Sequence, residues 1–259
     1  ILGSDVAGIV EAVGSNVKKF KIGDAVYGDL SDKNAWGGFA EYVCADENAI
    51  EPKPQNMTFE HAASLPQAAM LALQGLIDYG KIKSGTSLLI NGAGGGVGTI
   101  ALQIAKTFNA TVTGVDNDFK LQMMTDIGFD HVIDYRRDDF TRKSEKYDLI
   151  LDNKTNKHIF SLLPCLNPGG CYVTTGGNYW KILQLVILAP LIKLISSKQC
   201  KMVMLKPNKD LNYLNQLFLT GKLTPVIDKT FDLDNIREAF EYYASEQQKG
   251  KIVISIAKL

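Results

Sequence analysis

The chain has 259 residues, 46% of them hydrophobic and 22% charged, which is enough for one large domain or two ordinary ones with ample core. Lysine and arginine together number 28, as do aspartate and glutamate, and this balance argues against an electrostatic nucleic-acid binder. The four cysteines are scattered without a C-x-x-C pair. That pattern is typical of reduced thiols in a cytoplasmic protein and argues against a disulfide framework or a zinc knuckle.

The beginning of the chain predicts a small β-rich domain. Short β-forming runs at 6–13 and 25–27 are separated by glycine turns, as in an antiparallel, barrel-like domain. A further strand is expected within 36–43, after a pair of glycines. Pro52 and Pro54 then mark a linker, and residues 59–79 follow a helical pattern.

Residues 87–116 predict a strand, a glycine-rich turn, a helix and a second strand. The apolar run 88–90 is typical of a strand buried on both faces. Five of the seven residues 92–98 are glycine, and apolar residues then recur at helical spacing as far as Phe108. The second strand, 111–115, ends in Asp116, which lies 18 residues after the last glycine.

This arrangement suits a dinucleotide. Glycines let the backbone approach a pyrophosphate, the N–H groups at the helix start receive its charge, and the acid accepts hydrogen bonds from a ribose. The strict G-x-G-x-x-G spacing fails, because Val97 and Thr99 occupy its last position, so a purely structural turn is the alternative. The strand–turn–helix context favours the dinucleotide. A nucleoside triphosphate site is not expected, because no Gly-Lys-Ser/Thr follows the turn.

Strand and helix patterns continue to alternate after Asp116, which indicates a parallel, doubly wound sheet. Strands are expected at 131–135, 147–152 and 171–175, and the last is closed by Gly176-Gly177, where this kind of sheet places ligands. We expect a further helix at 210–219, with Gly221 as its stop signal.

The most apolar stretch, 180–195, is too short and too interrupted to span a membrane. It is interpreted either as a helix that covers the core or joins two subunits, or as a helix that contacts a membrane surface. We favour the first interpretation, while the lysines from Lys193 to Lys209 keep the second open.

The opening residues resemble the catalytic domain of the medium-chain dehydrogenases/reductases. The matching spacing consists of Gly3, Asp5, Gly8, Val10, Gly14, Val17, Gly23, Asp24 and Val26. The helix SLPQAAMLALQGL and the glycines at 92, 95 and 98 are similar to the quinone oxidoreductase branch, and 223–259 resembles the return of the family's chain into the catalytic domain.

The resemblance implies an α/β fold, with a Rossmann doubly wound parallel sheet plus a discontinuous, β-rich GroES-like catalytic domain. The expected domains are 1–65, 66–205 and 206–259, the last being the return to the catalytic domain. The implied activity is zinc-independent, NAD(P)H-dependent hydride transfer to a quinone, an activated alkene or a carbonyl. Zinc is not expected, because Ser4 stands where the zinc alcohol dehydrogenases of the family place a histidine ligand.

Two alternatives remain open at this stage. One is a non-catalytic dinucleotide-binding redox sensor or structural protein, because Leu71 replaces the branch's usual threonine near the nicotinamide and no general acid is identified. The other is a zinc-type alcohol dehydrogenase. The expected partner is a small-molecule substrate rather than nucleic acid, and a homodimer is expected.

The resemblance places Lys120 and Tyr135 at the 2′-phosphate of NADPH. Asp116, in contrast, resembles the acid of NAD-dependent alcohol dehydrogenases, and its carboxylate repels a 2′-phosphate, so we favour NADH. The candidate cofactor-binding residues are Gly92, Ala93, Gly94, Gly95, Gly96, Val97, Asp116, Lys120, Tyr135, Gly176 and Gly177.

Overall fold

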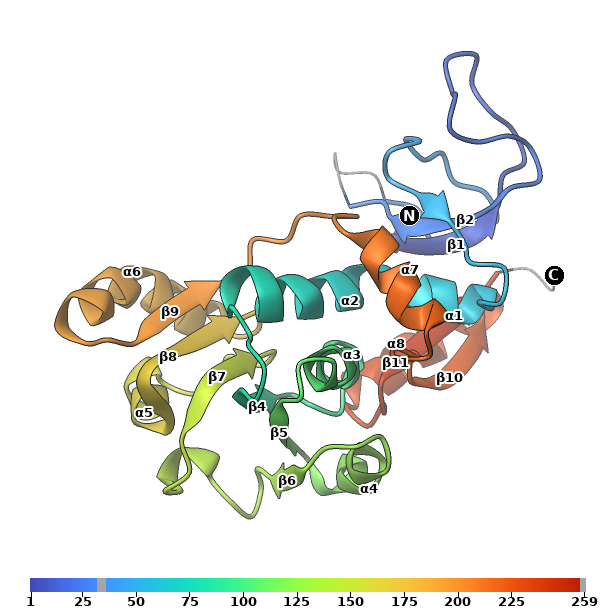
Figure 1. The fold of residues 1–259 in the computed structure, drawn as a ribbon. Coiled ribbons are helices and arrows are strands. Elements are labelled where there is room, and N and C mark those ends of the chain that lie inside the picture. The colour runs from blue at the N-terminus through green and yellow to red at the C-terminus, as the bar shows by residue number, and fades with distance from the viewer. Residues whose placement is uncertain (32–35, 257–259) are drawn as a thin grey trace. The chain divides into compact units, whose positions relative to one another are not determined.

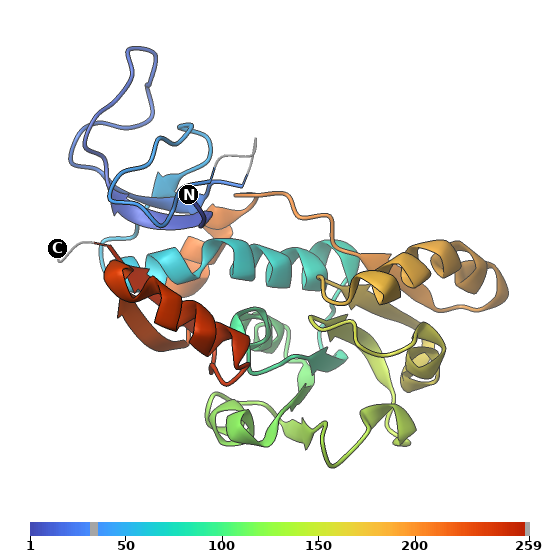
Figure 2. The same cartoon turned by 180° about the vertical axis from the view of Figure 1, so that it is seen from behind.

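The computed structural model describes residues 1–31 and 36–256 (Figures 1 and 2). The chain forms two compact units: unit 1 consists of 1–70 and 206–259, and unit 2 of 71–205. Both ends of the chain therefore belong to unit 1. The expected boundary at 66 is the first residue of helix α2, Pro66–Leu73, whereas the units divide after Met70.

Unit 2 is built on a six-stranded sheet in which all neighbouring strands are parallel. Its strands are β4 (Ser87–Asn91), β5 (Thr111–Asp116), β6 (His131–Asp134), β7 (Tyr147–Asp152), β8 (Leu166–Thr174) and β9 (Gln199–Met202). The order β6-β5-β4-β7-β8-β9 reverses direction at β4, which is the doubly wound arrangement that places ligands at the carboxyl ends of the strands. The predicted fold class is confirmed.

Helices cover both faces of this sheet. They are α3 (Gly96–Lys106), α4 (Asp118–Asp126), α5 (Ile159–Leu162) and α6 (Tyr179–Ile195), with 3₁₀ turns at Phe140–Arg142 and Leu163–Cys165. Figure 1 shows α3 and α4 on one side of the sheet and α5 on the other. Leu185 and Ile192 of α6 are buried in a core with Leu89, Ile150 and Tyr172 of the strands. Because both faces are covered, the central strands β4 and β7 contain continuous apolar runs, at 88–90 and 149–151.

The described part of unit 1 contains two small sheets, three helices and the beginning of α2. Strands β1 (Asp5–Ile9), β2 (Ala25–Asp29) and β3 (Glu51–Pro52) pair antiparallel, whereas β10 (Ile227–Asp232) and β11 (Lys251–Ser255) pair parallel. The helices are α1 (Phe59–Ser64), α7 (Leu211–Leu219) and α8 (Ile236–Ala244), the last preceded by a 3₁₀ turn at Leu233–Asn235. Helix α1 contacts both β1 and β11, so it joins segments from the two ends of the chain.

Helix α2 continues directly into a π-helical turn at Gln74–Tyr79. The expected helix over 59–79 is therefore interrupted once, at Leu65, where α1 ends and Pro66 begins α2. Proline is favourable in the first turn of a helix, because the N–H group that it lacks would have no partner there.

Three local predictions were wrong or incomplete. The strand expected within 36–43 does not form: the Phe39 N–H donates to the Leu2 carbonyl at 3.0 Å, and beyond it the backbone finds no partner strand among the described residues. Strand β1 stops at Ile9 instead of reaching residue 13. In the described part of unit 1 the strands form two separate sheets rather than a closed barrel.

Candidate dinucleotide site

The glycine turn connects β4 to α3 at the carboxyl edge of the sheet. Gly92 has a φ of +76°, which favours glycine, and the N–H groups of Gly92 and Ala93 both donate to the Val115 carbonyl, at 3.0 and 3.1 Å. The turn is thereby fixed to the neighbouring strand β5. Residues 92–94 are buried, whereas 95–97 are accessible to solvent.

The first turn of α3 presents unused hydrogen-bond donors. Gly95 is its N-cap, and the N–H groups of Gly96, Val97 and Gly98 have no acceptor among the residues that the structure describes. The space above them is open, because a Cβ added to Gly95 would find its nearest atom, the Gly92 oxygen, at 3.7 Å. Free donors at the positive end of a helix, with room above them, fit a phosphate group.

Gly98 has a different role from Gly95. It lies inside α3, as expected, and a Cβ there would collide with the backbone of Ala93. Its missing side chain lets the helix pack against the start of the turn. The turn therefore contains glycines that keep space for a ligand and glycines required by close packing.

Asp116 and Lys120 form a buried ion pair behind the turn. The Lys120 Nζ lies 3.5 Å from Asp116 Oδ1, and both side chains are only 3–4% exposed. The second carboxylate oxygen of Asp116 accepts a hydrogen bond from the Gly94 N–H at 2.8 Å, and the Asn117 N–H donates to Oδ1 at 2.9 Å. Lys120 thus lies against Asp116 rather than in solvent.

Gly94 makes room for this lysine. A Cβ added to Gly94 would lie 2.6 Å from Lys120 Cδ, so a side chain at that position would displace it. Removing two charges from water is costly unless they are paired and hydrogen-bonded, and the Asp116 carboxylate has both kinds of partner. The ion pair therefore helps to hold the shape of the glycine turn.

The end of β6 adds an exposed tyrosine and two arginines. The Tyr135 N–H donates to the Asp116 carbonyl at 3.1 Å, which places Tyr135 directly beside β5. The Arg136 guanidinium lies 6.0 Å from the centre of the Tyr135 ring and 3.2 Å from Asp118 Oδ1, and Arg137 pairs with Asp134. Sequence reasoning missed these arginines, although an Arg-Arg pair directly after a predicted strand was a signal that could have found them.

Asp152, at the end of β7, is fully buried and organises the next part of the edge. Its Oδ1 accepts hydrogen bonds from Asn91 Nδ2 at 2.8 Å and from the Lys154 and Thr155 N–H groups at 2.9 and 2.8 Å. Its Oδ2 accepts from the Tyr172 hydroxyl at 2.9 Å. Burial, together with the Asp152 charge, raises the pKa of Tyr172, so the phenol remains protonated and donates.

The loops after β7 and β8 are tied to each other. The Thr155 hydroxyl contacts the Thr174 hydroxyl and donates to the Gly176 carbonyl at 2.6 Å. Gly177 has a φ of +127°, and a Cβ there would collide with the Lys154 carbonyl. Because Asp152 also holds Asn91 of β4, the structure brings the predicted residues Gly176 and Gly177 to the same edge of the sheet as the glycine turn.

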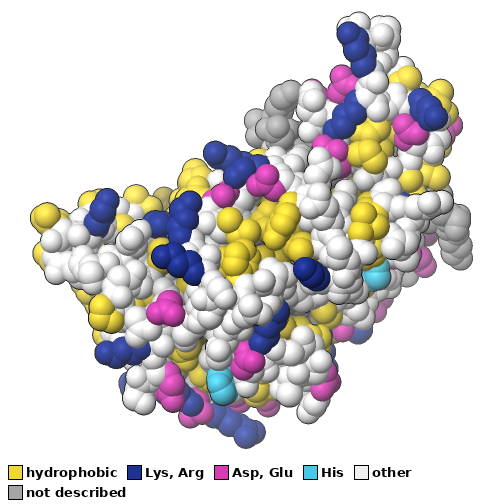
Figure 3. Space-filling view, in the orientation of Figure 1, with side chains coloured by type: hydrophobic (Ala, Val, Ile, Leu, Met, Phe, Trp, Pro, Cys, Tyr) yellow, Lys and Arg dark blue, Asp and Glu magenta, His cyan; other side chains and the backbone are white. Residues whose placement is uncertain are grey.

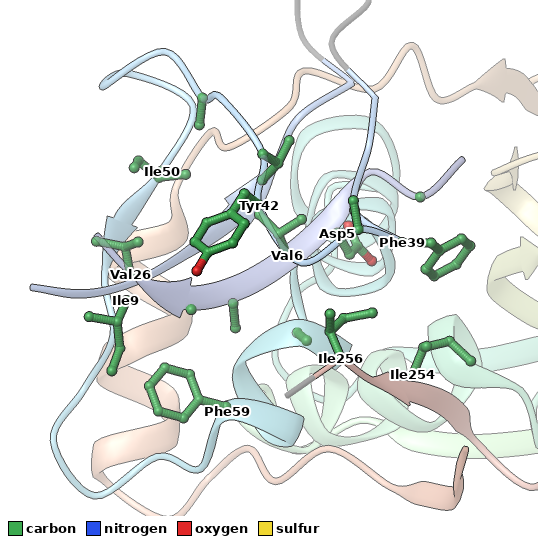
Figure 4. Close-up of a pocket in the computed structure, with 18 of the residues that line it drawn as sticks. Asp5, Val6, Ile9, Val26, Phe39, Tyr42, Ile50, Phe59, Ile254 and Ile256 are labelled. Carbon is green, nitrogen blue, oxygen red and sulfur yellow. The ribbon is translucent and has the colours of Figure 1, made fainter. Parts of the chain in front are cut away.

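Unit 1 contains a wide cavity of about 1670 Å³ between β1, β11 and residues 38–45 (Figure 4). Its lining is mainly apolar, and Phe39 and Ile254 are among the residues shown. Asp5 accepts a hydrogen bond from the Gln67 N–H at 3.0 Å and lies 3.5 Å from Lys251 Nζ. Burial raises the pKa of its carboxyl, although the Lys251 charge acts in the opposite direction. Asp5 therefore joins three segments of unit 1.

The residues described here do not fit a zinc site. Within 1–31 and 36–256, no group of three His, Cys, Asp or Glu side chains is placed to hold a metal ion. Ser4, at the position where the related zinc enzymes place a histidine, is buried, and its carbonyl accepts a hydrogen bond from the Leu30 N–H at 2.8 Å. The four cysteines are free and lie on separate elements or loops.

Comparison with known proteins gives the family. Residues 1–55 match the model of the alcohol dehydrogenase GroES-like domain, and residues 127–254 match that of the zinc-binding dehydrogenases. The solved quinone oxidoreductase from Coxiella burnetii superposes with a TM-score of 0.88 at 30% identity, over 99% of this chain and 79% of that one. The chain belongs to the medium-chain dehydrogenase/reductase superfamily.

Two curated members of this superfamily are similar along nearly the whole chain. The 2-methylene-furan-3-one reductase of Solanum lycopersicum is 33% identical over 97% of this chain and 62% of its own length. The chloroplastic NADPH-dependent alkenal/one oxidoreductase of Arabidopsis thaliana is 30% identical over 97% of this chain and 63% of its own length. The chain thus spans less than two thirds of either reductase. These matches confirm the predicted resemblance to the quinone oxidoreductase branch of the medium-chain dehydrogenases/reductases.

Proposed function

We propose that the chain acts as a NAD(P)H-dependent reductase that transfers a hydride to a carbon–carbon double bond conjugated to a carbonyl, as in an enone, an alkenal or a quinone. The observation that carries the proposal is the open first turn of α3, with its free N–H donors, at the carboxyl edge of the parallel sheet. The names of the similar proteins support the substrate class, because a methylene furanone, an alkenal and a quinone share this conjugation.

The chain's residues would divide the work of holding the cofactor. The N–H groups of Gly96 and Val97 would receive the pyrophosphate, and Tyr135 would border the adenosine end. The connected loops 152–155 and 174–177 would position the nicotinamide end. A bound reduced nicotinamide supplies the hydride, while the protein binds, orients and excludes water.

We propose that this chemistry proceeds without zinc. The support is the donor set of unit 1: Ser4 offers no strong metal ligand, and Asp5 is already engaged by Gln67 and Lys251. Elemental analysis that found stoichiometric zinc in the purified protein, with alcohol oxidation depending on it, would instead support the zinc-type alcohol dehydrogenase.

The choice between NADH and NADPH depends on Asp116. A free carboxylate about 4 Å from a 2′-phosphate would disfavour NADPH by roughly 4 kcal/mol at an effective dielectric near 20. In the structure, however, Lys120 neutralises this carboxylate and the Gly94 N–H binds it, while Arg136 lies beside Tyr135 on the same edge. We therefore propose that both cofactors are accepted and that any preference for NADH is small.

The test is a matrix of cofactors and acceptors. The oxidation of NADH and of NADPH is followed by absorbance with a benzoquinone, an alkenal and a methylene furanone, and cofactor binding is measured separately by calorimetry. We expect turnover of at least one conjugated acceptor with both cofactors. Tight binding without turnover of any acceptor would support the non-catalytic dinucleotide-binding protein instead.

A further inference from the structure

Helix α6 carries apolar side chains on two opposite sides. Leu185 and Ile192 face the core of unit 2 and are buried. The exposed face of α6 consists of Tyr179, Trp180, Leu183, Val186, Ile187, Leu191, Leu194 and Ile195. Residues 180, 183, 187, 191 and 194 are three or four positions apart, so they form one stripe along the helix. Trp180 is 72% exposed and Leu194 is 83% exposed.

A helix on the surface of a soluble protein normally turns a polar face to water. The exposed face of α6 is apolar instead, and Figure 3 shows apolar and basic side chains together at the α6 end of the view. Contiguous exposed apolar surface of this kind marks a site of contact with a protein or a lipid. Among the described residues no helix is long and apolar enough to cross a membrane, so a lipid contact would lie along the surface.

In the sequence segment that contains α6, the charged side chains are all positive. Residues 153–205 contain six lysines and no aspartate or glutamate, although the whole chain has equal numbers of basic and acidic residues. One of the six, Lys157, pairs with Asp139 at 3.0 Å. Lys193 lies in α6, is exposed and has no partner among the described residues. The ammonium groups of Lys198 and Lys201 bind the backbone carbonyls of Leu163 and Tyr79, which leave their positive charge uncompensated.

This charge distinguishes between the candidate occupants. A symmetric contact between two copies of the chain would bring the same lysines together with no acid in the segment to pair with them. An anionic lipid surface supplies both negative headgroups for the lysines and an apolar layer for the stripe. Tyr179 and Trp180, at the start of the helix, are the residue types that favour the headgroup level.

We propose that the exposed face of α6 binds the surface of a membrane that contains anionic phospholipids, with the helix lying in the interface. The apolar stripe inserts at the boundary between headgroups and acyl chains, and Lys193, Lys198 and Lys201 contact lipid phosphates and carboxylates. The proposal requires neither a bound nicotinamide nor turnover, so it stands or falls independently of the proposed reductase activity.

The test uses vesicles of phosphatidylcholine alone and of phosphatidylcholine mixed with phosphatidylserine. Binding is measured by co-sedimentation, and insertion by the fluorescence of Trp180 in a Trp36→Phe background, because these are the two tryptophans of the chain. We expect binding to the mixed vesicles, weakened by salt, with a blue shift of the Trp180 emission. Failure to bind the mixed vesicles would overturn the proposal.

Matched variants identify the surface. Lys193→Gln is expected to lower the partition coefficient about fivefold, as for the loss of one lysine at an anionic surface. Leu191→Gln with Leu194→Gln is expected to lower it about tenfold or more. The controls are Leu219→Gln on α7, where the leucine is 56% exposed against 55% for Leu191, and Lys222→Gln at an exposed lysine. Equal losses in the controls would contradict the assignment to α6.

Oligomeric state provides a second, independent test. Sedimentation velocity is measured without vesicles for the wild type and for the Leu191→Gln/Leu194→Gln variant. We expect the two proteins to have the same oligomeric state, because the stripe contacts lipid rather than protein. A dimer that is lost in the variant, together with no binding to vesicles, would show that the exposed face of α6 joins two copies.

Discussion

Replacing Gly95 by serine is expected to stabilise the fold and weaken cofactor binding at the same time. Gly95 has a φ of −90° and a ψ of 177°, an extended conformation that every residue adopts, and a Cβ there meets no atom closer than 3.7 Å. Serine is also a better N-cap than glycine, because its hydroxyl accepts a hydrogen bond from an N–H group of the first turn, here that of Val97 or Gly98.

The two effects have calculable sizes. Removing a glycine from the unfolded chain contributes about 0.4–1 kcal/mol of stability, and the cap adds a few tenths. For a chain of this length, a gain of about 1 kcal/mol in the free energy of unfolding raises Tm by about 2–4 °C. A serine hydroxyl that accepts from the Val97 N–H, however, occupies a donor that we propose for the pyrophosphate, and a hydrogen bond to a charged group contributes about 1.5–3 kcal/mol. The affinity for NADH and NADPH should therefore fall roughly 10- to 150-fold.

The assay combines thermal unfolding without cofactor and calorimetric titration with each cofactor. Gly98→Ala is the matched control three residues away, because its Cβ collides with the Ala93 backbone, and it should lower stability by about 1–3 kcal/mol. If Gly95→Ser were more stable and bound both cofactors with unchanged affinity, the first turn of α3 would not be the phosphate site, and the reasoning would be refuted.

Three further results are expected. Lys120→Met should destabilise the protein by about 3–5 kcal/mol, since it leaves the Asp116 carboxylate buried without its ion-pair partner; denaturant titration showing a loss below 1 kcal/mol would contradict the buried pair. Tyr172→Phe should lower the free energy of unfolding by about 1–3 kcal/mol, because Asp152 Oδ2 loses its donor. A variant as stable as the wild type would show that this hydrogen bond does not stabilise the fold. Burial raises the pKa of Asp5 above its ordinary value of 3.8, ahead of the opposing Lys251 charge, so the folded chain binds a proton at Asp5 more tightly than the unfolded chain. The stability that this titration contributes is present below pH 3.8 and is lost as the pH rises through the folded-state pKa. Asp5→Asn should abolish this pH dependence, so the free energy of unfolding of the wild type minus that of the variant should fall as the pH rises; a difference that rises with pH would contradict the raised pKa.

Periodic, strongly apolar elements could be predicted from the sequence. Strand β7 forms over Tyr147–Asp152 as expected, because burial on both faces of the sheet leaves a continuous apolar run. Helix α3 follows the glycine turn as its apolar spacing predicted. Strand β9 was not predicted, since Gln199–Met202 is short, lies at the edge of the sheet and mixes polar with apolar residues. Whether such a segment forms a strand depends on β8 offering it a partner, which no local pattern records.

In the candidate site, too, some features could be predicted from the sequence and others could not. The type and position of Asp116 could be predicted, because an acid at the end of the second strand has a known geometric meaning. The direction of its carboxylate could not, since it depends on the Gly94 N–H across the turn. The resemblance placed Lys120 at the 2′-phosphate of NADPH, and its ion pair with Asp116 could not be predicted. Its burial follows from the space that Gly94 leaves open in three dimensions, and not from its own neighbours in the sequence.

The division of unit 1 into two distant segments has a consequence for the order of events during synthesis. Asp5 reaches Lys251, and α1 contacts β11, so unit 1 lacks these contacts until the last part of the chain has been made. Residues 71–205 are contiguous, however, and have their whole sheet available beforehand. At roughly 5–20 residues per second, on the order of ten seconds pass while that segment leaves the ribosome. The nascent chain should therefore carry a folded unit 2 while the first segment of unit 1 still awaits its partner strands.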